Sequence, residues 1–367
     1  MATKRKLYTS QILNKVINVT GVIRLSKMSK NNLIIPQAQR THADLKRLQA
    51  LPLQQKIMLF KRRVFQFQNL FDGHVYGAFS GGKDSTMMMN LIWEDFPEIP
   101  GVFSNTGLEY PEIVKFVKKT AETNNVEIVR PKMSFKQVID KKGWAVVSKV
   151  QSMAISRYRN TKDPLQKEYR TTGCKNGEKI GMAGVISKKH QYLIDAPFKI
   201  SEGCCDALKK SPFKVYQRET GRKPIIGTMA EESELRLSQY IKHGCNMLEK
   251  GNPMSAPMSF FTEQDVLNYF RLTGKEYCSV YGDIAPTKEF LQMDMFGADD
   301  EAQKYTTTGE KRTGCMWCMF GLEQETLANN GENRFTRMRK THPKQWDAVV
   351  NKYGGKEVLE FMNLPYE

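Results

Sequence analysis

The segment that most restricts how this chain can fold runs from Tyr76 to Thr86 and contains the sequence SGGKDS. An apolar, β-prone run, Val75 to Phe79, leads into two glycines, and Met87 to Ile92 behind them is mostly apolar. This pattern predicts a strand, a tight glycine turn and a buried helix. Such a turn brings backbone N–H groups close to an anion at the positive end of the helix dipole, so it predicts a phosphate site.

The Walker A loop is the first alternative to compare. The spacing of Gly77 and Gly82-Lys83 satisfies G-x-x-x-x-G-K, but Asp84 follows where Walker A has the Ser or Thr that holds magnesium. This mismatch disfavours a P-loop NTPase. A turn without a ligand is also disfavoured, because SGGKDS places polar groups in a turn that needs only glycine.

The rest of the chain alternates between strand and helix patterns. Short apolar strands are predicted at 102–104, 126–129 and 224–228, and a helix begins at Pro111. The alternation predicts an α/β fold with a doubly wound, mostly parallel sheet and added helical segments. Ligands of such sheets bind at the carboxyl ends of the strands, which places residues 80–85 and 105–109 on one rim.

Two prolines mark predicted helix boundaries. Pro52 separates two helices predicted between Thr41 and Phe67. A helical stretch that follows Cys205 is predicted to end before Pro212, because proline cannot donate to the helix ladder.

Composition and charge restrict the class of protein. The 367 residues have a net charge of +17, which favours an anionic partner, either a nucleotide or nucleic acid. No apolar run approaches the roughly 20 residues of a membrane span, and the first residues lack the apolar region of a signal peptide, so we expect a cytoplasmic protein without a membrane partner.

We divide the chain into three parts. Residues 1–45 form a basic extension, 46–270 the nucleotide-binding α/β domain, and 271–367 a segment that completes a cysteine site. A basic insertion near 148–180 has three interpretations that the sequence leaves open: a lid over the nucleotide, a nucleic-acid-binding patch with interleaved Tyr158 and Tyr169, or a solvated pair of helices.

Seven cysteines without a secretion signal indicate metal or catalytic use rather than disulfides. Four of them form two pairs, and we predict these as metal ligands: Cys204, Cys205, Cys315 and Cys318. Adjacent cysteines are uncommon in zinc sites, whereas an iron–sulfur cluster spreads its iron atoms and accommodates them more easily. An iron–sulfur cluster is therefore favoured over zinc and over redox-active thiols.

SGGKDS resembles the PP-loop of the adenine nucleotide alpha-hydrolase-like family, which includes phosphoadenylyl sulfate (PAPS) and adenylyl sulfate (APS) reductases and tRNA thiolation enzymes. The C-C and C-x-x-C pairs are similar to the 4Fe-4S signature of assimilatory APS reductases, although the gap between them is longer here. The resemblance implies a 4Fe-4S cluster, ATP or APS/PAPS as substrate and a possible magnesium ion. It implies nucleotide binding by Ser80, Gly81, Gly82, Lys83, Asp84, Ser85, Thr86, Asn105, Thr106, Gly107, Glu109 and Ser233.

The resemblance also implies catalytic residues, with one departure. It assigns Lys83 and Asp84 to the loop chemistry and Arg236 to the sulfate, although Arg236 could equally pair with Glu232. Reductases of the family use a cysteine in a C-terminal tail, and this sequence has none after Cys318. Cys174, which has basic neighbours, is the candidate replacement.

The sequence therefore supports two functions. The first is an enzyme of sulfur metabolism, either a reductase of adenylyl sulfate or an ATP-dependent sulfurtransferase, served by a thioredoxin-like protein or another electron or sulfur donor. The second is a non-catalytic nucleic-acid-binding or regulatory protein that keeps the nucleotide fold and the cluster.

Overall fold

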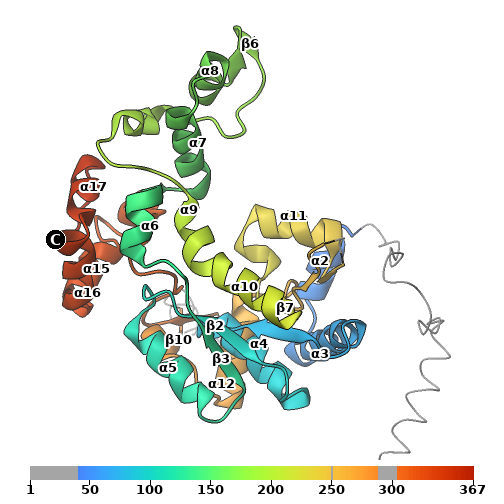
Figure 1. The fold of residues 1–367 in the computed structure, drawn as a ribbon. Coiled ribbons are helices and arrows are strands. Elements are labelled where there is room, and N and C mark those ends of the chain that lie inside the picture. Colours follow the sequence, from blue (N-terminus) through green and yellow to red (C-terminus); the bar gives the residue numbers. More distant parts are fainter. Residues whose placement is uncertain (1–39, 249–250, 288–303) are drawn as a thin grey trace, which may run out of the picture.

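A computed structural model describes residues 40–248, 251–287 and 304–367 (Figure 1). The predicted extension, residues 1–45, therefore lies outside the described residues except for its last six. Two helices follow, α2 (His42–Gln49) and α3 (Leu53–Leu70), and Pro52 lies between them as the sequence predicts.

The central sheet has the strand order β3-β2-β1-β7-β9-β8 in the part of the chain that the structure describes. Its strands are β1 (Val75–Ala78), β2 (Gly101–Ser104), β3 (Val126–Val129), β7 (Lys223–Ile226), β8 (Asn246–Met247) and β9 (Met254–Ser255). All neighbours are parallel except β8 and β9. Because the chain builds outward from β1 to β3 and then returns to the other side of β1, the sheet is doubly wound, and the predicted fold class is confirmed.

Helices cover both faces of this sheet, and β1 shows why. Its side chains alternate, so Gly77 faces α4 (Lys83–Asp95) and Tyr76 faces α10 (Ser211–Thr220). A Cβ on Gly77 would lie 2.0 Å from the sulfur of Met89, so only glycine lets α4 pack this closely. On the opposite face Tyr76 packs against Phe213, with ring centroids 6.0 Å apart.

The helix around Pro212 corrects a prediction. The chain stays helical from α9 (Gly203–Cys205) through η2 (Asp206–Lys210) into α10, rather than ending before Pro212. Proline has no backbone N–H group, so the carbonyl of Leu208, four residues before Pro212, lacks its usual helical donor. The hydroxyl of Ser104, at the end of β2, donates to that carbonyl at 3.3 Å. This tertiary bond, together with the π-helical turn, allows the helix to continue.

The basic insertion forms a projection that we call the arm, residues 149–189. It contains α7 (Lys149–Asn160), α8 (Pro164–Thr172) and the hairpin of β5 (Cys174–Lys175) and β6 (Glu178–Lys179). The arm extends away from the sheet, with the hairpin at its far end (Figure 1). At its base β4 (Val146–Val147) pairs with β12 (Met319–Phe320), directly after Cys318.

The remaining elements complete the sheet surroundings and the C-terminal helices. They are α5 (Pro111–Ala121), α6 (Phe135–Lys142), η1 (Lys188–Asp195), η3 (Ala230–Glu232), α11 (Glu234–His243), α12 (Glu263–Thr273), η4 (Ser279–Tyr281), β10 (Ile284–Pro286), β11 (Tyr305–Thr307), α14 (Leu322–Ala328), α15 (Arg334–Thr341), α16 (Pro343–Asp347), η7 (Ala348–Lys352) and α17 (Gly355–Phe361). None of the helices among the described residues has the length and apolar character needed to cross a bilayer.

Candidate functional site

The SGGKDS loop joins β1 to α4 at the carboxyl rim of the sheet. Gly81 has φ +69°, and a Cβ there would lie 2.8 Å from the Cγ2 atom of Val117 in α5. Both the backbone conformation and the space therefore require glycine. Gly82 is the N-cap of α4, so the first amide groups of that helix, from Lys83 onward, are turned toward the loop.

The serine hydroxyls of the loop hold its shape. The Oγ atoms of Ser80 and Ser85 are 2.9 Å apart, and Ser85 Oγ donates to the carbonyl of Gly82 at 3.0 Å. By contrast, Thr86 Oγ1 and Asp84 Oδ1 are buried and have no hydrogen-bond partner among the described residues. Buried polar atoms of this kind cost free energy unless a further group satisfies them.

Lys83 is buried at the centre of the site, with only 3% of its surface exposed. Its Nζ atom donates to the carbonyl of Lys311 at 3.0 Å and lies 3.1 Å from Glu263 Oε1. Its backbone N–H donates to the hydroxyl of Tyr281 at 3.2 Å. The Tyr281 hydroxyl therefore accepts a hydrogen bond from an N–H group at the N-terminus of α4. In a phosphate-binding loop, a phosphate oxygen accepts from an N–H group at this position.

Charged groups surround Asp84. Burial raises the pKa of the Asp84 carboxyl, and the positive charges of Lys83 and Arg312 oppose that change. Arg236 also acts on this carboxyl, but it forms an ion pair with Glu232. The pairing of Arg236 with Glu232 is thus observed, and a role of Arg236 toward a sulfate stays a prediction. Ser233, which was predicted to bind the nucleotide, caps α11 by accepting from the N–H of Arg236 at 3.4 Å.

The second predicted rim segment, residues 105–109, is closed by its own hydrogen bonds. The Glu109 carboxylate accepts from the N–H of Thr106 at 3.0 Å and from its hydroxyl at 2.7 Å. Asn105 accepts from the N–H of Gly107 at 3.2 Å. These contacts form a turn beside the loop, and the carbonyl of Leu108 accepts from the N–H of Met316 at 2.8 Å. The turn thereby anchors the C-x-x-C segment.

The four paired cysteines lie together. Burial, together with the neighbouring Cys315, Cys205 and Cys318, raises the pKa of Cys204 to about 12. Burial likewise raises the pKa of Cys315 to about 11. Within the described residues, no three Cys, His, Asp or Glu side chains have the arrangement of a single-ion metal site. Because these four thiols affect one another, the fold has brought together two cysteine pairs that are about 110 residues apart in sequence.

Lys209 is a cation that lies beside the thiols. Burial alone would lower the pKa of Lys209, but the neighbouring Cys315, Glu109 and Cys205 outweigh it, and the pKa is raised. Four half-buried sulfur donors with a cation beside them match the ligands and the charge of an iron–sulfur cluster bound through thiolates. The residues therefore fit the cluster that the resemblance implies.

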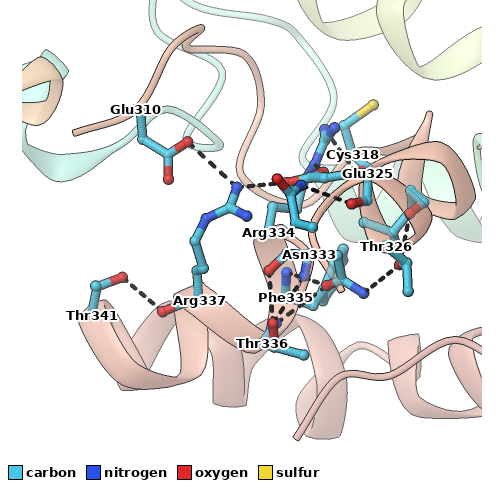
Figure 2. Close-up of polar contacts among 12 residues, drawn as sticks. Glu310, Cys318, Glu325, Thr326, Asn333, Arg334, Phe335, Thr336, Arg337 and Thr341 are labelled. Atoms are coloured by element: carbon cyan, nitrogen blue, oxygen red, sulfur yellow. Dashed lines mark hydrogen bonds and ion pairs between the residues drawn. The ribbon is translucent and has the colours of Figure 1, made fainter. Parts of the chain in front are cut away.

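A network of hydrogen bonds and ion pairs supports the C-x-x-C segment from behind (Figure 2). Arg334 donates to the carbonyls of Cys318 at 3.2 Å and Phe320 at 3.3 Å, and its Nε donates to Glu325 at 2.9 Å. Arg337 joins Glu325 to Glu310, with an Arg337–Glu310 distance of 3.6 Å. The guanidinium of Arg334 thus fixes the backbone on which Cys318 is carried.

The other three cysteines lie elsewhere. Cys174 pairs with Lys179 in the hairpin at the far end of the arm (Figure 1). Cys245 and Cys278 are 1% and 0% exposed, respectively, and burial raises the pKa of both thiols. None of the three presents an accessible thiol at the SGGKDS loop.

Sequence reasoning missed several residues of the site. Tyr281, Glu263 and Arg312 approach the loop from distant parts of the chain, and no local motif marks them. The only sequence feature that points to any of them is the C-x-x-C pair. A segment that brings Cys315 and Cys318 to the site also brings the residues just before them. Lys311 and Thr313, which contact Lys83 and Tyr281, lie directly before Cys315.

Comparisons with known proteins agree with the loop and the topology. Residues 74–319, two thirds of the chain, match the phosphoadenosine phosphosulfate reductase domain family. No curated protein matches the sequence.

Two solved structures show a weaker likeness. A phosphoadenylyl-sulfate reductase from Candida auris, in a phosphate complex, is 13% identical over 73% of this chain and 100% of its own, with a TM-score of 0.36. The U34-tRNA thiolase NcsA from Methanococcus maripaludis, with its 4Fe-4S cluster, is 15% identical over 85% of this chain and 82% of its own, with a TM-score of 0.34. Likeness at this level carries no argument about what this chain does.

Proposed function

Because the chain belongs to the phosphoadenosine phosphosulfate reductase domain family, we propose that it is an adenine-nucleotide-dependent enzyme of sulfur chemistry, and specifically an ATP-dependent sulfurtransferase. The observation that carries this proposal is one short segment, residues 311–318. It contacts Lys83 through the carbonyl of Lys311 and supplies Cys315 and Cys318 to the thiol cluster. A nucleotide on the loop would therefore lie next to the cysteine site.

The N-terminus of α4 and the buried Lys83 would hold the phosphates. Backbone N–H groups from Lys83 onward would replace their present partners with phosphate oxygens, and Arg312 would add positive charge. Asp84 would orient the loop or a magnesium ion that accompanies ATP. Cys204, Cys205, Cys315 and Cys318 would hold a 4Fe-4S cluster, which supplies iron and sulfide close to the nucleotide when bound.

The reaction has two steps. An oxygen atom of the acceptor attacks the α-phosphorus of ATP, the bond to the bridging oxygen breaks, and pyrophosphate leaves with the electron pair. A hydrosulfide ion then attacks the carbon that carries this oxygen and a carbon–sulfur bond forms. The bond between this carbon and the oxygen breaks, AMP leaves with the oxygen and the electron pair, and the hydrosulfide proton passes to solvent. Lys83 would stabilise the negative charge that develops on pyrophosphate. Neither step requires an oxidant or a reductant.

The cysteines favour this reaction over the reduction of adenylyl sulfate. A reductase of the implied type needs an accessible thiol that attacks sulfur. Cys245 and Cys278 are buried, and Cys174 lies at the far end of the arm (Figure 1). The loop therefore has a cation, Lys83, that can bind phosphate. Apart from the proposed cluster ligands, it has no thiol nearby that could attack the sulfur of adenylyl sulfate.

A nucleotide panel tests the proposal. We expect the anaerobically purified protein to bind ATP and to release AMP and pyrophosphate when sulfide and the acceptor are supplied in a cell extract freed of small molecules. Lys83→Gln should weaken ATP binding by about 10- to 100-fold, since a charge-assisted hydrogen bond contributes about 1.5–3 kcal/mol. Lys119→Gln, which removes an exposed lysine paired with Glu276, is the matched control and should bind normally.

Two results would contradict the proposal. Release of sulfite from adenylyl sulfate or its 3′-phosphate, with dithiothreitol as reductant, would identify a reductase. Equal ATP affinity of wild type and Lys83→Gln would show that the loop is not the nucleotide site.

A further inference from the structure

The excess positive charge of this chain is concentrated in two segments. The arm, residues 149–189, has ten Lys or Arg residues and three Asp or Glu residues, a net charge of +7. Residues 1–39 contribute another +7, so everything else adds only +3 to the total of +17. The arm therefore has the same net charge as residues 1–39 within 41 residues, whereas the remaining 287 residues together add only +3, so the charge per residue is much higher in the arm.

Much of the charge on the arm is not neutralised by carboxylates. Arg157, Lys162, Lys179 and Lys188 are exposed, and none of them forms an ion pair with a described residue. The arm also leaves apolar surface uncovered toward its tip, where Ile180 and Met182 are 58% and 65% exposed. Exposed cations on a projection give a positive potential that reaches into solvent.

Two tyrosines lie among these cations. Lys167 Nζ is 5.5 Å from the ring centroid of Tyr158. The Tyr169 ring has Arg170 at 5.2 Å and Lys175 at 5.9 Å from its centroid. The Tyr169 hydroxyl donates to the carbonyl of Ala183 at 2.6 Å, which fixes the ring on the arm. Alternating cations and aromatic rings can contact phosphates and stack with bases.

We propose that the arm binds nucleic acid, with its cations on the sugar-phosphate backbone and Tyr169, which is not packed against the core as Tyr158 is, available to an unpaired base. Charge complementarity favours nucleic acid as the partner, because its regularly spaced phosphates can bind several separated cations of the arm at once. The inference is independent of the reaction proposed above, since the arm and the SGGKDS loop are different surfaces (Figure 1).

Binding and its salt dependence test the proposal. The full-length protein is titrated with three labelled probes of equal length: an RNA hairpin, a DNA duplex and a single-stranded oligonucleotide. The arm variant replaces three exposed cations: Arg157→Gln, Lys162→Gln and Lys179→Gln. Its affinity should fall about tenfold or more near 0.1 M salt, and the slope of log K against log salt should become shallower by up to about 3.

A matched variant removes the same charge from the body, where Lys115, Lys118 and Lys141 are exposed and have no ion pair with a described residue. The triple change Lys115→Gln, Lys118→Gln and Lys141→Gln should leave affinity and slope within about twofold of wild type, since it removes no phosphate contact. Circular dichroism of both variants checks that they are folded.

Three outcomes overturn the inference. They are the absence of binding by wild type, equal weakening by the two triple variants, and equal affinity for polyglutamate of the same charge, which would indicate a site for acidic proteins. ATP turnover is measured separately. If turnover is absent but the arm variant alone loses nucleic-acid binding, the proposed function fails and this inference stands.

Discussion

At the scale of single residues, Glu323 joins the base of the arm to the body. His190 Nε2 lies 2.9 Å from both of its carboxylate oxygens, and Lys189 Nζ lies 2.9 Å from one of them. Burial alone would raise the pKa of Glu323, but the hydrogen bonds from Lys189 and His190 outweigh it, and the pKa is lowered. The carboxylate is therefore more stable as an anion in the folded protein than in the unfolded chain.

A pH dependence follows from that direction. A carboxyl whose pKa is lower in the folded state stabilises the protein fully above its unfolded pKa of about 4.3, and this stabilisation disappears as the pH falls through the folded pKa. Glu323→Gln should lower the free energy of unfolding by about 1–2 kcal/mol at neutral pH, and the difference from wild type should vanish in acid. Urea unfolding between neutral pH and about pH 3 measures both.

The matched control for this experiment is Glu332→Gln. Glu332 pairs with Lys340 at 2.6 Å on an exposed surface, so water screens the pair and its loss should change stability much less. A constant difference between Glu323→Gln and wild type at every pH would contradict the assignment of the effect to this carboxylate.

At the scale of secondary-structure elements, a buried ion pair joins α3 to α12. Lys56 is 2% exposed, and its Nζ donates to both oxygens of Asp265, at 2.9 and 2.7 Å. Asp265 also accepts from the N–H of Thr262 at 2.7 Å in the capping box of α12. One carboxylate therefore both starts a helix and fixes it to a second helix.

Removing one partner of this pair should cost more than neutralising both. Lys56→Met leaves a buried carboxylate without its cation and should destabilise the protein by about 3 kcal/mol. Adding Asp265→Asn removes the charge but keeps an oxygen for Thr262, so the double variant should regain part of that loss. Denaturant unfolding of both single variants and the double variant gives the coupling energy. A double variant whose loss equals the sum of the single losses would show that the residues do not interact.

Elements with a local cause could be predicted from the sequence. Ser134 and Thr262 cap α6 and α12 through hydroxyls that accept from amides only three residues away, so the cause lies within one short stretch of sequence. The continuation of the helix through Pro212 could not be predicted in this way. It depends on Ser104, which is 104 residues distant and reaches Leu208 only once the sheet and helix have packed.

The same distinction applies to the site. The glycine loop and the cysteine pairs could be predicted, because each consists of residues that are adjacent or nearly adjacent in the sequence. Tyr281 contacts the amide of Lys83 from 198 residues away, and Lys209 lies beside Cys315 only in the folded chain. Groups that tune a site through tertiary contacts leave no periodic or spacing signal in the sequence.

At the scale of the whole molecule, the two cysteine pairs lie in α9 and in the segment that precedes β12. We expect anaerobically reconstituted protein to be brown, with broad visible absorbance and about four iron atoms per chain. Cys315→Ser should lose the colour and the iron, because the thiolate ligand is removed. Cys174→Ser, on the arm, is the matched control and should keep both. A colourless wild-type protein that contains zinc would contradict the proposal of an iron–sulfur cluster.

The two ends of the arm meet at one side chain. Gln151 donates to the carbonyl of Val185 at 3.0 Å and accepts from the N–H of Ser187 at 2.9 Å. A segment whose exit and return are held together in this way can be lengthened, shortened or exchanged during evolution without moving the sheet or the cysteines. Selection could therefore change what this protein recognises while leaving its chemistry in place, and relatives of the chain would be expected to differ most between residues 152 and 184.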